Sequence, residues 1–286
     1  MSRLIKANFA RLFKSGVFRM YMAFSGIIGV LCVLMRYFDY QKHMERYNEL
    51  PPESHTIDGI AFVGIVYLLF AIPVFVGIFL GTEYSDGTIR NKLMIGHKRT
   101  DIYSANLIVC SVGTIIGAAL NLLINFTLGA ALCGLEVLKA TDIIKTIIFT
   151  FIALVSATAV MVLISMIISS KAGASVAVII ITMVMFFSTL TIRNKLDAPE
   201  YNESYSYVNN ETGAVIDVPE EKNQYYISGT KRKVYQAVYD VMPTSHIYEY
   251  VMIDTEHAGK YAGYDGVIFI ATTALGIILF RKKDLK

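Results

Sequence analysis

The side chains that could carry out covalent or metal chemistry lie along this sequence without the spacing that such chemistry requires. The five histidines form no His-Glu-x-x-His pattern, and no Gly-x-Ser-x-Gly elbow is present, so the signatures of zinc and serine hydrolases are missing. Cys32, Cys110 and Cys133 lie singly in apolar runs, which indicates buried thiols and neither disulfides nor a zinc site. We therefore expect no catalytic residue and no metal site.

The most informative polar stretch is segment 83–101. Thr88 is suited to cap a helix of about two turns whose far end is Gly96, and the glycines at 87 and 96 permit sharp turns on both sides. The result is a basic rod of about 12 Å. Its apolar side chains need a surface to cover them, which predicts a docking element for another protein. These side chains are Ile89, Leu93 and Met94.

The first 16 residues predict an amphipathic helix that lies flat on a membrane surface with its basic half toward lipid phosphates. One half of the helical wheel holds Leu4, Ile5, Asn8, Phe9, Leu12 and Phe13, and the other holds Arg3, Lys6, Ala7, Ala10, Arg11 and Lys14. The pattern fits a topology anchor and a mechanical lever against a cytoplasmic partner equally well.

These segments are positioned by long apolar runs. The chain of 286 residues is 55% hydrophobic and only 17% charged, more apolar than a soluble core requires. Runs long enough to cross about 30 Å of hydrocarbon, with no charged residue at their centres, predict six transmembrane helices and an all-α polytopic membrane protein. They lie near 17–38, 59–82, 102–133, 143–170, 172–192 and 261–280, with a tight helical hairpin at 169–171.

Basic residues set the expected orientation. Lys and Arg gather in 1–16, in segment 83–101 and after the last span, and such residues are retained in the cytoplasm. We therefore expect a plasma membrane protein with both termini cytoplasmic. It comprises an interfacial helix (1–16), spans one to five (17–192), an extracellular insertion (193–260), and a last span with a basic tail (261–286). The net charge of +3 gives no reason to expect nucleic acid as a partner.

Two stretches of this sequence resemble a known family. Glu-Tyr-Ser-Asp-Gly-Thr-Ile-Arg-Asn-Lys-Leu at 83–93, followed by Lys-Arg-Thr-Asp-Ile-Tyr at 98–103, resembles the first cytoplasmic loop of ABC transporter permeases of the ABC-2 type. Gly-Ile-Ile-Leu-Phe-Arg-Lys-Lys-Asp-Leu at 276–285 is similar to the closing span and tail of that family.

The resemblance implies a homodimer of permease subunits that binds two copies of a separate ABC ATPase, with the translocation path between the permeases. It also implies a coupling helix that enters a cleft on the ATPase, flanked by Glu83 and the N-terminal helix. The coupling residues it implies are Glu83, Gly87, Thr88, Ile89, Arg90, Asn91, Lys92, Leu93 and Met94.

The nucleotide chemistry is expected in the partner. The sequence contains no Gly-x-x-x-x-Gly-Lys-Ser/Thr loop, so we expect this chain to bind no cofactor and ATP with Mg²⁺ to bind the ATPase subunit. The large outer insertion resembles that of Gram-positive permeases that export, or confer immunity to, antimicrobial and toxin peptides. The alternative is a membrane sensor or assembly protein that recruits a soluble partner without transport. A secondary transporter is disfavoured because the span centres lack acidic residues.

The insertion is predicted to fold locally. Residues 205–208 and 214–218 predict a small β-hairpin, 230–241 a helix, and 245–253 a second short helix after Pro243. The first helix carries Val234, Ala237, Val238 and Val241 on one face. A solvated lid over the pathway and an acidic surface that selects cationic peptides both remain open.

Polar and small residues inside the spans have mainly architectural interpretations. Asn121 and Asn125 lie four residues apart on one face of the third span, where they bond to neighbouring helices or line a pathway. The glycine pairs 77 and 81, and 113 and 117, predict close helix packing.

Overall fold

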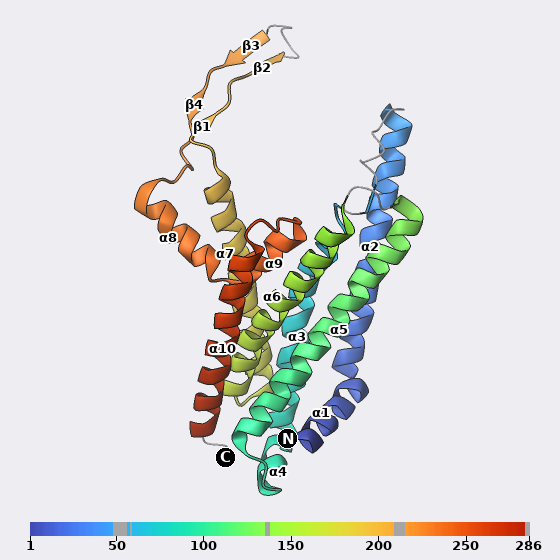
Figure 1. The fold of residues 1–286 in the computed structure, drawn as a ribbon, viewed down its shortest axis with the longest axis vertical. Helices are drawn as coiled ribbons and strands as arrows, with labels where there is room; N and C mark the ends of the chain where they lie inside the picture. Colours follow the sequence, from blue (N-terminus) through green and yellow to red (C-terminus); the bar gives the residue numbers. More distant parts are fainter. Residues whose placement is uncertain (48–55, 58, 135–137, 209–214, 284–286) are drawn as a thin grey trace.

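The computed structural model describes residues 1–47, 56–57, 59–134, 138–208 and 215–283, most of which are helical (Figure 1). The helices are α1 (Ser2–Lys14), α2 (Gly16–Tyr47), α3 (Val63–Ser85), α4 (Thr88–Met94), α5 (Arg99–Cys133), α6 (Ala140–Ile167), α7 (Lys171–Asp197), α8 (Gly229–Asp240), α9 (Pro243–Val251) and α10 (Ala258–Lys282). The strands are β1 (Tyr201–Asn202), β2 (Tyr205–Val208), β3 (Val215–Val218) and β4 (Glu221–Lys222).

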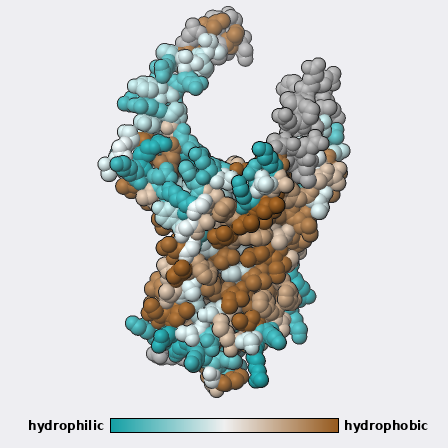
Figure 2. All heavy atoms as spheres, in the orientation of Figure 1, coloured by the Kyte–Doolittle hydropathy of each residue, from teal (hydrophilic) through white to brown (hydrophobic). Residues whose placement is uncertain are grey.

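Six of these helices are long and apolar enough to cross a membrane: α2, α3, α5, α6, α7 and α10. Figure 2 shows the apolar side chains as a band between two hydrophilic ends. The end that carries α1, α4 and the end of α10 is here called basal, and the end that carries α8, α9 and the strands is called apical (Figure 1). The chain is therefore an all-α polytopic membrane protein, as its apolar runs predict. The tight turn between α6 and α7 also lies where it was expected.

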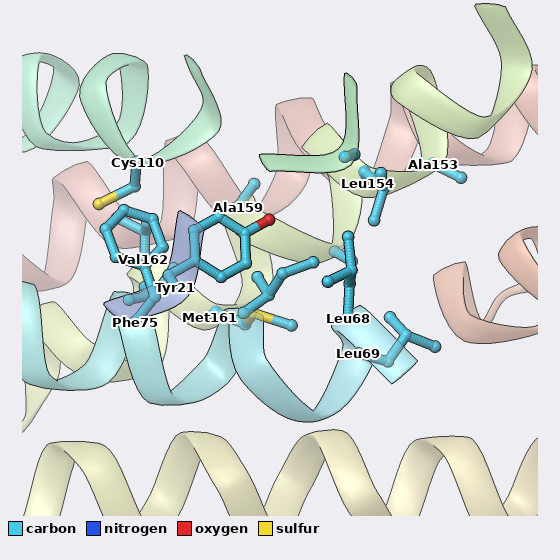
Figure 3. Close-up of a cluster of buried hydrophobic side chains, with 14 of the residues drawn as sticks. Tyr21, Leu68, Leu69, Phe75, Cys110, Ala153, Leu154, Ala159, Met161 and Val162 are labelled. Carbon is cyan, nitrogen blue, oxygen red and sulfur yellow. The ribbon is translucent and has the colours of Figure 1, made fainter. Parts of the chain in front are cut away.

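The core forms where α2, α3, α5 and α6 meet (Figure 3). Tyr21 of α2 stacks on Phe75 of α3, with ring centroids 5.2 Å apart, and Cys110 and Val162 complete the buried cluster from α5 and α6. Helix α7 packs mainly on α3, and α10 packs mainly on α6. All three cysteines are buried free thiols, as the sequence predicts.

Glycines set how closely these helices approach. A Cβ atom added at Gly77 would lie 2.7 Å from the Cα atom of Ser175, so α3 and α7 meet backbone to backbone. The same atom at Gly113 would meet the ring of Phe75, and at Gly117 it would meet the ring of Tyr21. The predicted close packing is confirmed, but the second pair makes room for aromatic rings and not for a helix backbone.

The apical insertion has the hairpin and the two short helices that the sequence predicts, with the second helix starting two residues earlier, and a further strand pair that was not predicted. Strands β2 and β3 pair antiparallel, with Tyr205 opposite Val218, and β1 pairs with β4 (Figure 1). Helix α9 begins at Pro243, which ends the preceding helical path because proline lacks an N–H donor. The common face of Val234, Val238 and Val241 is exposed, because α8 turns Tyr239 and Asp240 toward the rest of the protein.

Candidate functional site

Helix α4 is a single short rod at the basal end, and two glycines with positive φ set its position. Gly87 (φ 65°) forms its N-cap and Gly96 (φ 96°) turns the chain after it, in backbone conformations that strain residues with a Cβ atom. The expectation that Thr88 caps this helix is wrong, because Thr88 is its first residue and no side chain caps it. The following helix, α5, begins at Arg99.

The two sides of α4 face different surroundings. Ile89 is only 1% exposed and Lys92 is buried, so this side packs inside the chain, with Leu93 partly covered. Met94 and Ile95 are 77% and 79% exposed, the highest values among the large apolar side chains of the described residues. Of Ile89, Leu93 and Met94, which were expected to need a partner surface, only Met94 is exposed. Ile95, which was not in that set, is exposed beside it. Arg90 and Asn91 are exposed beside them.

Glu83, at the basal end of α3, is the centre of a buried polar cluster. Its carboxylate is inaccessible to solvent and pairs with Arg11 of α1 at 2.8 Å and with Lys92 of α4. Asn106 of α5 donates to its second oxygen at 2.6 Å. A buried carboxylate persists only where cations and donors replace its water, so these elements are held at one point.

Asn8 of α1 closes the ring around this carboxylate. Its amide oxygen accepts a hydrogen bond from Lys92 at 2.9 Å, and its amide nitrogen donates to Asn106 at 2.7 Å. The guanidinium of Arg11 lies 3.9 Å from the centre of the Phe79 ring, a cation–π contact. We name Asn8, Arg11, Glu83, Lys92 and Asn106 the basal hub. Burial lowers the pKa of Lys92, although the neighbouring Glu83 carboxylate acts in the opposite direction.

The end of α10 is tied to the same region. Arg99 donates hydrogen bonds to the carbonyl oxygens of Phe280 and Arg281, each at 3.1 Å, which satisfies acceptors that the helix end leaves open. Lys283 donates to the hydroxyl of Tyr84 at 2.9 Å and to the carbonyl oxygen of Met166 at 3.0 Å. Partial burial lowers the pKa of Lys283 to about 8.

The two membrane asparagines lie inside the helix bundle. Both are fully buried; Asn121 donates to the backbone oxygen of Ser25 on α2 at 3.1 Å, and Asn125 donates to Asn121 at 2.9 Å. The oxygen of Asn121 also fills the space left by Gly64 on α3. Asn121 therefore bonds α5 to α2, whereas the bond of Asn125 stays within α5.

Sequence reasoning did not assign Asn8, Asn106, Tyr84 or Lys283 to this site. One signal was present: Asn8 is the single strongly polar residue in the apolar half of the N-terminal helix. Arg11, placed by its wheel position toward lipid phosphates, turns instead to Glu83. The residues that Arg11 contacts are distant from it in sequence, so no local pattern indicates them.

The fold and this site define a polytopic helical membrane protein whose basal end is organised around one buried carboxylate. Comparisons with protein-family models, with curated proteins and with solved structures give no match for the chain. Across the described ranges, no group of three or more His, Cys, Asp or Glu side chains is placed to hold a metal ion.

Proposed function

We propose that this chain is the transmembrane permease subunit of an ATP-driven ABC exporter. In this proposal the basal end is cytoplasmic, the membrane is the plasma membrane, and two copies of the chain assemble with two copies of a separate ABC ATPase that binds ATP and Mg²⁺. The proposed cargo is an antimicrobial or toxin peptide, or another amphipathic substrate, that leaves the cell.

The observation that carries the proposal is the basal hub. A rod that received force from another protein would need a rigid link to the spans, because a loose loop would absorb the movement. Lys92 of α4 is bound to Glu83 and Asn8, and Glu83 is bound in turn to Asn106. A displacement of α4 would therefore reach α1, α3 and α5 together.

The surface proposed to meet the ATPase is the exposed side of α4, formed by Arg90, Asn91, Met94 and Ile95. Apolar anchors ringed by polar residues are typical of the energetic centre of a protein interface. Ile89 and Lys92 act inside the chain in this scheme and transmit the movement, whereas Met94 and Ile95 make the contact.

The test replaces the two exposed apolar residues, Met94→Asp together with Ile95→Asp, in the full chain co-purified with its ATPase subunit. Binding should weaken roughly 30-fold or more, the cost of losing a hot spot of about 2 kcal/mol. Stimulation of ATP hydrolysis by the permease should be lost, with membrane insertion unchanged. Val215→Asp, at an apolar residue of the apical hairpin that is 65% exposed, is the control.

Two outcomes would overturn the proposal. One is normal stimulation of ATP hydrolysis in the double variant. The other is the finding that the soluble protein bound at the basal end has no ATPase activity. This result would favour the sensor or assembly function.

A further inference from the structure

An apolar groove runs along the outside of α7 and is roofed at its apical end by α8. Its volume is about 730 Å³, and apart from Ser188 and Thr191 its lining is apolar or aromatic. Val184, Phe187 and Val234 in its walls are all more than half exposed, so nothing within the described chain fills it. The wall of α7 extends from Ile179 to Ile192, about 20 Å at the rise of a helix.

Both walls of the groove end in a lysine on the same helical stripe. Lys195 lies three residues beyond Ile192 on α7, and Lys231 lies three residues before Val234 and four before Tyr235 on α8. Residues three or four apart share a helix face, so each lysine continues the lining of its own wall. The groove is thus apolar along its length and cationic at its apical mouth.

The mouth of the groove is held in a fixed geometry. Arg232 donates a hydrogen bond at 2.8 Å to the carbonyl oxygen of Leu196, which joins the start of α8 to the end of α7. The ammonium of Lys195 lies 5.4 Å from the centre of the Tyr235 ring. Asp197, the nearest acidic residue on α7, is paired with Arg193 and leaves the lysines available to an anion.

We propose that this groove binds one acyl chain of an anionic phospholipid in the apical leaflet, with the headgroup phosphate between Lys195 and Lys231. The hydrocarbon of one leaflet is half of the roughly 30 Å core, and the wall of α7 is longer than this depth. The lysines at the mouth then meet the phosphate where a lipid places it. A second copy of this chain docked here by two-fold symmetry would bring its own Lys195 and Lys231 to the same depth. The repulsion between these lysines disfavours such a dimer.

The experiment measures lipid binding to the purified full chain by native mass spectrometry and by thermal unfolding in detergent. The probes are phosphatidylglycerol and phosphatidylcholine with identical acyl chains. The wild-type protein should bind phosphatidylglycerol more tightly and gain more thermal stability from it. Lys195→Gln with Lys231→Gln should lower the apparent affinity for phosphatidylglycerol roughly 30-fold, at about 1 kcal/mol for each lysine, and leave phosphatidylcholine binding unchanged.

Lys233→Gln is the matched control, because Lys233 is an exposed lysine of α8 that faces away from the groove stripe. It should retain the preference for phosphatidylglycerol. An equal loss of phosphatidylglycerol affinity in the control would show that the lysines of this region attract anionic lipid without a defined site, and would overturn the proposal. Equal binding of the two lipids to the wild-type protein would also overturn the site. A third variant, Val184→Trp, fills the groove. If it abolishes dimers and leaves phosphatidylglycerol binding intact, a second copy of the chain and not a lipid occupies the groove. Neither measurement requires an ATPase, so the result is independent of the proposed function.

Discussion

Glu83 brings together donors from three other helices, α1, α4 and α5. Its buried carboxylate faces buried Lys92 and Asn106 and the partly exposed Arg11. The attraction in such a site offsets a large desolvation cost only while every member is present. The arrangement therefore makes the basal end sensitive to the loss of any one charge.

Replacing Glu83 by Gln should destabilise the folded protein by about 3–5 kcal/mol, because buried Lys92 and partly buried Arg11 lose their counter-charge. Lys92→Met should restore part of this loss when it is added to Glu83→Gln. Thermal unfolding of the purified chain and its variants measures both effects in a double-mutant cycle. Glu203→Gln, at an exposed apical residue, should change stability by less than about 0.5 kcal/mol. Additive losses at Glu83 and Lys92 would refute the pairing.

Lys283 predicts a pH dependence of stability. Burial lowers its pKa to about 8 in the folded protein, whereas an unfolded lysine titrates near about 10.4. Between these values the unfolded chain binds more protons, so the contribution of Lys283 to stability rises with pH in that window and is constant below it. Lys283→Met should flatten part of this rise, measured as unfolding temperature against pH, and Lys282→Met, at the exposed neighbour, should not. Equal slopes in both variants would contradict the assignment.

At the scale of elements, the contact between α3 and α7 depends on the absence of side chains. Gly77→Ala places a Cβ atom within 2.7 Å of the α7 backbone and should cost about 1–3 kcal/mol through overpacking. Gly263→Ala in α10 is its matched control, because nothing lies within 4 Å of the added atom. Thermal unfolding compares the two single variants. Equal stability of both proteins would show that α7 is free to move away from α3.

Much of the element level could be predicted from the sequence, because each signal is local. Apolar runs give the spans, and Pro243 and the alternation at 205–218 give the apical elements. The site was only partly predictable: glycine spacing marks α4, but which side of α4 is covered depends on Glu83 and on α1. Wheel position also placed Val234 and Val238 on a common face without showing that this face stays exposed.

At the scale of the whole molecule, ionic clusters mark both limits of the apolar band. The basal hub has an apical counterpart in which Glu249 pairs with Arg193 and accepts a hydrogen bond from Tyr239 at 2.6 Å. Nearby, Lys260 of α10 pairs with Asp240 of α8 at 2.6 Å. Charged contacts therefore hold α3 and α5 to α1 and α4 at the basal end, and α7 and α10 to α8 and α9 at the apical end.

The hairpin formed by β1 to β4 stands apart from this framework (Figure 1). Its strands contact chiefly each other, and Tyr201 pairs with Lys222 where the hairpin joins the helices. Replacing 201–222 by a short Gly-Ser linker should leave the unfolding temperature within about 2 °C of the wild-type value, since little packing is lost. Thermal unfolding and the yield of membrane-inserted protein measure this outcome. Loss of cooperative unfolding would show that the hairpin supports the bundle.

The bond between Arg99 and the end of α10 also has a consequence for biosynthesis. The carbonyl oxygens that Arg99 contacts belong to Phe280 and Arg281, which the ribosome adds long after α5 has been made. A nascent chain that has inserted α2 to α7 but not α10 therefore lacks the two carbonyl oxygens that Arg99 contacts in the complete fold. The basal hub can thus form from residues made early, whereas the contacts of Arg99 with α10 form only after the last span has been made.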